Sequence, residues 1–306
     1  MRRKLIKQGN QSYTVTVPIK WIREHSLKDN AELEVNSENS SITFSLPKDV
    51  ERHISKVEIN LNGYGEKSIK NILYQKYRKG YDQISLTFQE EEQLSIIKKV
   101  VHKTILGFEI VEIKNNICTI QNISEPSKEK FSVILRKIFI TIKEEGKEIM
   151  QDIQDNNKNK LKTREESKHM IDTYTNFCRR LIIKEKIEGQ KNSYSLMAIV
   201  SQLSLIYHSY FYMYKYYCEN NNVKLCNKTK EVITLLDKMF NLFYESFYQK
   251  DLKKANEIAI LKEQLVENDI YNTFRITSGN ENIILYHCGE IVRLIQMAST
   301  NIYGLT

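Results

Sequence analysis

Positive charge is concentrated in the first thirty residues. Seven Lys or Arg side chains there are balanced only by Glu24 and Asp29, and the whole chain of 306 residues carries a net charge of +8. Basic side chains at this density can neutralise the phosphates of a nucleic acid. An ordinary surface hairpin with scattered lysines explains the charge alone equally well. The candidate DNA-contacting residues are Arg2, Arg3, Lys4, Lys7, Lys20 and Arg23.

Acidic, histidine and cysteine side chains in the second half are candidate metal ligands. Carboxylates four residues apart share a helix face and can hold a metal, but neither Asp172 nor Glu290 has such a partner. His287 and Cys288 are adjacent, so they point about 100° apart on a helix. His208 lies on an apolar helix and reads as a core histidine. We expect Asp172 and Glu290 to be solvated or capping residues, and any metal site to be weak or lost.

Motifs for covalent chemistry and for nucleotide binding are missing from the sequence. It contains no Cys-His or Ser-His-Asp order and no GxxxxGK[ST] phosphate loop, and its ten glycines are few for a nucleotide-binding protein. We therefore expect neither an enzyme nor a bound cofactor.

Composition indicates a soluble globular protein of two or three domains. Hydrophobic residues make up 41% of the chain and charged residues 27%. The five cysteines form no CxxC pair, and the charged N-terminus has no apolar signal-peptide core. We expect reduced, buried thiols and a cytoplasmic location.

One segment approaches the length of a membrane span. Residues 196–214 contain no Asp, Glu, Lys or Arg. However, they include three serines, a glutamine, a histidine and four tyrosines, which are costly in hydrocarbon. We expect a buried bundle helix and no membrane insertion. Of the tyrosines between Tyr207 and Tyr217, some should pack in the core and some could form a subunit or partner surface.

The basic residues lie on a β-α-β-β segment over residues 1–48, which we call the head. Alternating Tyr13, Val15 and Val17 predict a strand, and Pro18 can start a helix because a first turn needs no N–H from it. A segment of this length buries little apolar surface by itself. The head should therefore dimerise or dock on something else. The predicted strands cover 4–7, 12–17, 32–35 and 41–46, and the helix covers 18–25.

Residues 49–125 alternate between strand and helix patterns, which predicts a small α/β middle unit. Asn115 and Asn116 form the turn of its last hairpin. Strands are expected over 57–61, 84–88, 107–113 and 117–123, and helices over 67–78 and 91–104.

Residues 126–306 should be entirely helical. No proline follows Pro126, and an interior proline would cost a helix about 3 kcal/mol. Apolar residues at spacings of three, four and seven predict six helices, which imply two packed three-helix bundles. Ser127, Asp251 and Asn280 are the expected N-caps. The six helices cover 127–153, 163–187, 193–219, 228–249, 251–274 and 280–303.

Residues 9–21 resemble the AbrB/SpoVT-like swapped-hairpin DNA-binding domain. They read Gly-Asn-Gln-Ser-Tyr-Thr-Val-Thr-Val-Pro-Ile-Lys-Trp, and a later hydrophobic pair around Glu34 and Val35 also corresponds. In that family, two protomers interleave hairpins into one barrel, and basic residues around it contact DNA. The resemblance implies a homodimer formed through the head, with DNA as its partner.

The helical half resembles PhoU, a phosphate-uptake regulator built from two three-helix bundles. Residues 245–256 read Glu-Ser-Phe-Tyr-Gln-Lys-Asp-Leu-Lys-Lys-Ala-Asn, like the helix–Asp–Leu–Ala–helix junction of that family. Residues 106–112, Leu-Gly-Phe-Glu-Ile-Val-Glu, are similar to the middle of archaeal members. The chain departs from the family at 203–208, where Leu-Ser-Leu-Ile-Tyr-His stands in place of Glu-Arg-Ile-x-Asp-His. That departure puts the family's metal sites in doubt.

Together the resemblances imply an archaeal-type PhoU regulator with an AbrB/SpoVT-like DNA-binding head. The expected fold is α+β multidomain: a β-rich swapped-hairpin head, the α/β middle unit and an all-α, PhoU-like pair of three-helix bundles. The implied function is a dimeric, DNA-binding transcriptional regulator linked to phosphate uptake. In the alternative, the head only dimerises and the protein is a signalling adaptor of a phosphate transporter or sensor. A third reading is metal storage on the bundles.

Overall fold

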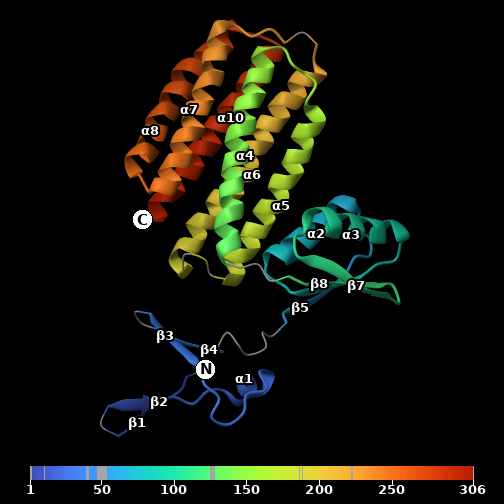
Figure 1. The fold of residues 1–306 in the computed structure, drawn as a ribbon, viewed down its shortest axis with the longest axis vertical. Helices are drawn as coiled ribbons and strands as arrows, with labels where there is room; N and C mark the ends of the chain where they lie inside the picture. The colour runs from blue at the N-terminus through green and yellow to red at the C-terminus, as the bar shows by residue number, and fades with distance from the viewer. Residues whose placement is uncertain are drawn as a thin grey trace. The chain divides into compact units, whose positions relative to one another are not determined.

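A computed structural model describes residues 2–9, 11–38, 41–46, 54–124, 128–185, 187, 189–221 and 223–305. The fold is mixed α+β, with small sheets first and a helical C-terminal region (Figure 1). This confirms the predicted class. The chain divides into two compact units, residues 1–55 and 56–306. The boundaries predicted at 48/49 and 125/126, and the Ser127 cap, lie outside the described residues.

The head consists of two hairpins and a short helix. Strand β1 (Ile6–Gln8) pairs antiparallel with β2 (Ser12–Thr14), and β3 (Glu34–Glu38) with β4 (Ser41–Ser45). Helix α1 (Ile19–Glu24) lies between the hairpins in the sequence. None of the head's described side chains is buried. As a single copy, the described head therefore has no hydrophobic core.

Residues 56–124 form the α/β unit, a four-stranded sheet covered on one face by two helices (Figure 1). The strand order is β5-β6-β8-β7, with β5 parallel to β6 and β8 antiparallel to both of its neighbours. Buried side chains on β6 and β8 pack with those of the helices. Between them along the same strands, the polar residues Ser85 and Thr119 lie side by side. The elements are β5 (Lys56–Asn60), α2 (Glu66–Arg78), β6 (Gln83–Thr87), α3 (Glu91–Thr104), β7 (Phe108–Lys114) and β8 (Ile117–Asn122).

The C-terminal region is built from long helices around a continuous core. Asp251 caps α8 as predicted, since its carboxylate accepts hydrogen bonds from the backbone N–H groups of Lys253 and Lys254. Within the described residues, no helix has the length and apolarity needed to cross a membrane. The long helices are α4 (Lys128–Gln154), α5 (Leu161–Glu185), α6 (Gly189–Glu219), α7 (Asn227–Gln249), α8 (Leu252–Glu263) and α10 (Asn280–Thr300).

Two predictions for the last helices were wrong in detail. The helix expected over 251–274 is divided, because α8 continues into a π-helical segment, η1 (Gln264–Ile270), and then α9 (Tyr271–Ile276). The N-cap of α10 is Gly279, with φ of +62°, and the Asn280 side chain instead accepts a hydrogen bond from Tyr216. A final 3₁₀ turn, η2 (Asn301–Gly304), follows α10.

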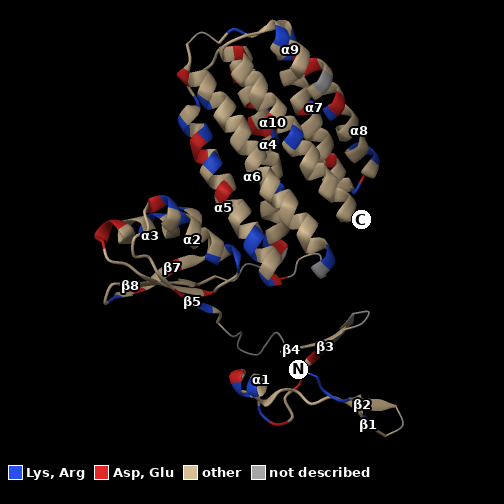
Figure 2. Cartoon of the chain, turned by 180° about the vertical axis from the view of Figure 1, so that it is seen from behind, with Lys and Arg blue, Asp and Glu red and all other residues tan. Residues whose placement is uncertain are grey.

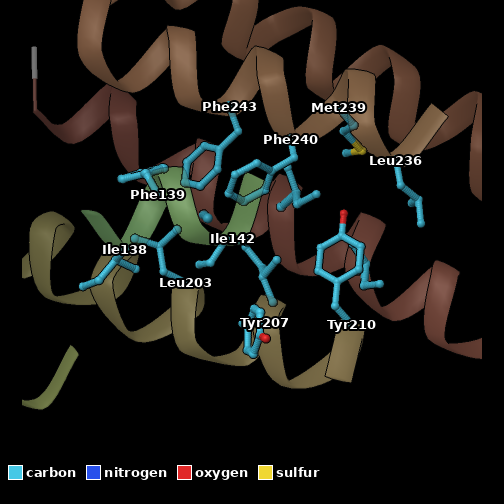
Figure 3. Close-up of a cluster of buried hydrophobic side chains, with 14 of the residues drawn as sticks. Ile138, Phe139, Ile142, Leu203, Tyr207, Tyr210, Leu236, Met239, Phe240 and Phe243 are labelled. Atoms are coloured by element: carbon cyan, nitrogen blue, oxygen red, sulfur yellow. The ribbon is translucent and has the colours of Figure 1, made fainter. Parts of the chain in front are cut away.

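Aromatic side chains fill the bundle core (Figure 3). The ring of Phe139 on α4 lies 5.3 Å from that of Phe243 on α7, centroid to centroid. Tyr207 and Tyr210 of α6 enter the same core, whereas Tyr212 is 47% exposed. The tyrosines thus occupy more than one face, and most of them pack inside.

Helix α5 anchors the α/β unit through Arg180, which is fully buried. Its guanidinium donates to the backbone oxygens of Tyr77 at 3.0 Å and Tyr81 at 2.7 Å, and to Asp82 Oδ1 at 2.8 Å. The rings of Tyr77 and Phe108 lie 5.2 and 4.9 Å from it. One charged side chain therefore ties a helix of the bundle to both a helix and a turn of the α/β unit.

Candidate nucleic-acid interface

The N-terminal arm and the first hairpin present four of the predicted cations. Arg2, Arg3 and Lys4 precede β1 outside regular secondary structure, and Lys7 lies within β1 opposite Tyr13. All four basic side chains are exposed. Gly9 follows β1 with a φ of +66°, a conformation that glycine adopts without steric cost. The arm and the hairpin thus carry unburied positive charge at the start of the chain (Figure 2).

Helix α1 presents the other two cations. Pro18 is its N-cap, and the Pro18 carbonyl accepts the first helical hydrogen bond, from Ile22 N at 3.2 Å. Lys20 and Arg23 are three residues apart and both exposed. Lys20 Nζ lies 3.8 Å from Glu24 in a solvated pair, which contributes little to stability. Pro18 therefore starts the helix as predicted, although β2 ends at Thr14, before the predicted end at residue 17.

The structure distributes the six cations over three elements: the arm, β1 and α1. Of the six, only Lys20 and Arg23 lie on the same face of one helix. In the described part of the head, no hydrogen bond or ion pair joins the arm to α1. The six cations therefore come from two parts of the described head, the arm with β1 and helix α1.

Large apolar side chains are also exposed on the head. Leu5 is 72% exposed, Tyr13 64% and Ile42 63%. Exposed apolar side chains of this size can serve as contacts for another molecule. The same unit thus offers cations for an anionic partner and apolar groups for a protein contact.

Asp172 of α5 is half-buried and hydrogen-bonded to α6, so the prediction of a solvated or capping residue was wrong in part. Its carboxylate accepts hydrogen bonds from Ser204 Oγ and His208 Nε2 of α6, both at 2.8 Å. Lys168 Nζ lies 3.6 Å from the same carboxylate. His208 is thus a satisfied histidine, as expected, and Lys168 supplies a positive charge beside the acid.

These contacts predict how Asp172 affects stability with pH. Burial alone would raise the pKa of Asp172, but His208, followed by Lys168 and Ser204, outweighs burial and lowers it. A lowered folded-state pKa contributes stability above about pH 4, the unfolded value, and that contribution is lost as pH falls through the folded value. In urea titrations, Asp172→Asn should therefore destabilise the protein most near neutral pH. The gap from wild type should close in acid, and a gap that widened would contradict this assignment.

Glu290, His287 and Cys288 of α10 do not converge on one point. Glu290 accepts a hydrogen bond from Ser209 Oγ at 2.8 Å and lies 3.5 Å from His287 Nδ1. Burial lowers the pKa of His287. Cys288 is buried, with its Sγ 3.9 Å from Met213 Sδ. Among the residues that the structure describes, no three His, Cys, Asp or Glu side chains are placed to hold a metal ion.

Sequence reasoning missed an acidic cluster around a buried arginine. Glu145, Glu148 and Asp152 of α4 surround the guanidinium of Arg164, whose nitrogens lie 3.3, 2.7 and 3.2 Å from them. Tyr207 donates a hydrogen bond to Glu145. The spacing of the three acids places them on one helix face, which was the available signal. Their partner, Arg164, lies on another helix, and sequence spacing does not identify it.

Comparison with protein-family models, with curated proteins and with solved structures gave no match. Functional assignment therefore depends on the chemistry of the chain's own residues. The described head supplies that chemistry as six exposed cations beside exposed apolar side chains.

Proposed function

We propose that the protein is a DNA-binding transcriptional regulator linked to phosphate uptake, acting as a dimer through its head. One observation carries the proposal: Arg2, Arg3, Lys4, Lys7, Lys20 and Arg23 are all exposed on a unit whose described side chains include no buried residue. Such cations bind the phosphates of DNA and release counterions, and a few of them can reach base edges.

The missing core supports dimerisation. Leu5, Tyr13 and Ile42 remain exposed in a single copy, and a unit of this size needs a partner to bury enough apolar surface. The resemblance to the AbrB/SpoVT-like domain supports a second copy of the chain as that partner. Interleaved hairpins would bury the apolar side chains and bring two sets of cations onto one surface.

The helical region supports the link to phosphate uptake. Helices α4, α5 and α6 contact one another, as do α7, α8 and α10, which fits a PhoU-like pair of three-helix bundles. The PhoU-like junction is locally well formed, because Asp251 caps α8 while Lys254 pairs with Glu245 of α7. In this proposal the helical region senses or docks, and the head binds DNA.

The salt dependence of DNA binding tests the proposal. If about six to eight phosphates are neutralised, the logarithm of affinity for a random-sequence duplex should fall against the logarithm of salt concentration with a slope of roughly −5 to −7. Fluorescence anisotropy of a labelled duplex measures this. A flat slope, or no binding at low salt, would refute DNA binding.

Charge reversal assigns the binding to the head. Arg2→Glu, Arg3→Glu and Lys4→Glu together should weaken binding at least about tenfold and make the slope shallower by about one for each lost phosphate contact. A matched control reverses three exposed lysines of the second unit. It should bind DNA as the wild type does, and equal losses in the two triple variants would count against the head. The control substitutions are Lys98→Glu, Lys230→Glu and Lys253→Glu.

The adaptor function is the second candidate. It is favoured by the pairing of Lys20 with Glu24, since the acid offsets part of the positive charge that α1 presents. In that case the head only dimerises, and the helical region binds a phosphate transporter or sensor. The two candidates differ in the anisotropy experiment, because the adaptor would dimerise but not bind DNA.

A further inference from the structure

A cleft of about 730 Å³ lies between helices α2 and α3 of the α/β unit and helix α5 of the bundle. Small-molecule sites typically occupy 300–1,000 Å³ and often lie where two folded parts meet. All three helices belong to the same compact unit. The cleft therefore has the size and location of a ligand site, and it contains none of the head's residues.

The walls of the cleft carry an excess of positive charge. Lys70 projects from α2, Lys99 and Lys103 from α3, and Lys162 from α5. The lining acids are two adjacent glutamates, Glu165 and Glu166. Of the lysines, Lys70 pairs with Glu66, whereas Lys99, Lys103 and Lys162 form no salt bridge to a described carboxylate. Three cations on two walls are thus available to an anion.

The interior of the cleft is suited to a flat, partly apolar group. Tyr74 and Tyr174 line it from opposite helices, α2 and α5, and Val100, Leu106 and Met170 supply apolar surface. Tyrosine rings stack on planar groups and keep a polar edge toward water. This combination of rings and lysines differs from a plain anion site, which would need no apolar surface.

Contacts across the cleft hold its walls in place. The Thr173 hydroxyl of α5 lies 3.3 Å from the Lys103 carbonyl at the end of α3 and 2.8 Å from the His169 carbonyl. Below the cleft along α5, Arg78 Nε donates to Asn176 Oδ1 at 2.8 Å. The two walls are therefore joined by direct contacts, and a ligand would meet a preformed surface.

We propose that this cleft binds a nucleotide. The base would lie against the tyrosines and the apolar surface, and the phosphates would be bound by Lys99, Lys103 and Lys162. Lysine side chains take the place of a glycine-rich phosphate loop, which the sequence lacks. The inference does not depend on DNA binding, because it uses no residue of the head.

Calorimetric titration of the full chain tests the site. ATP should bind more tightly than AMP, and both should bind more tightly than adenosine or inorganic phosphate. Lys103→Glu should weaken ATP binding at least about tenfold. Lys98→Glu is the matched control, because Lys98 is an exposed residue of the same helix outside the cleft. It should bind ATP as the wild type does. Circular dichroism and thermal unfolding verify that both variants are folded.

Three results would overturn the proposal. They are the absence of ATP binding at millimolar concentration, equal affinities for ATP and inorganic phosphate, and equal effects of Lys98→Glu and Lys103→Glu. The triple head variant separates this site from the DNA-binding proposal, since it should retain full ATP affinity. Loss of ATP binding in that variant would place the nucleotide on the head and refute the cleft.

Discussion

Replacing Arg180 with alanine is expected to lower the free energy of unfolding by about 3–5 kcal/mol, the usual cost of removing one partner of a buried ion pair. The side chain of Arg180 is 1% exposed, and that of its partner Asp82 is 16% exposed. The substitution also leaves the Tyr77 and Tyr81 carbonyls without these donors, which adds a desolvation cost. Urea denaturation measures the loss.

Lys184→Ala is the matched control, because Lys184 contacts the same Asp82 carboxylate from a more exposed position. Its loss should be smaller than that of Arg180→Ala, because Lys184 contacts Asp82, whereas Arg180 also donates to the Tyr77 and Tyr81 carbonyls. Arg180→Lys keeps the charge but not the fork of donors, so its stability should lie between those of wild type and Arg180→Ala. Hydrogen exchange should show faster opening of α2 in Arg180→Ala. Equal stability losses in Arg180→Ala and Lys184→Ala would mean that Arg180 does not anchor the α/β unit.

Arg164→Met should be comparably damaging, by about 3–5 kcal/mol, because it removes the cation shared by two largely buried carboxylates, those of Asp152 and Glu145. The side chain of Arg164 is 3% exposed and contacts Glu145, Glu148 and Asp152. Methionine keeps much of the length and packing of the arginine stem, so the loss reports mainly on charge. Urea denaturation near neutral pH measures it.

Two further variants distinguish charge from packing at this cluster. The side chain of Lys160 is 42% exposed, and its Nζ lies 3.2 Å from Asp152. Lys160→Met should therefore cost about 1 kcal/mol or less. Combining Arg164→Met with Asp152→Asn should recover part of the lost stability, since it removes one of the repelling acids. A double variant less stable than Arg164→Met alone would contradict the electrostatic explanation.

Local patterns were sufficient for many elements of the fold. The helix predicted over 91–104 has those bounds, and the strands of the α/β unit lie within a residue of their predicted positions. Asp251 was identified as an N-cap because a carboxylate before a helical pattern accepts from the first N–H groups. These features depend on contacts between residues that are close in the sequence, so the sequence alone predicts them.

Features that depend on distant contacts could not be predicted in the same way. Arg180 and Arg164 look like ordinary helix-surface residues, and only packing shows that they are buried. The π-helical segment η1 inserts into a pattern that fits one continuous helix. For the proposed DNA contacts, the sequence predicted cations that the structure places at exposed positions. How two chains would combine them depends on an interface that one chain does not contain.

In the proposed function, assembly of the coreless head depends on the concentration of the protein itself. In the proposed dimer, the head buries its apolar side chains only against a second copy and therefore assembles by mass action, whereas the helical region has a core of its own. Well below the dimer dissociation constant, the amount of assembled head should rise with roughly the square of the chain concentration. In the proposed function, a modest change in synthesis or degradation would then change promoter occupancy disproportionately, without any ligand.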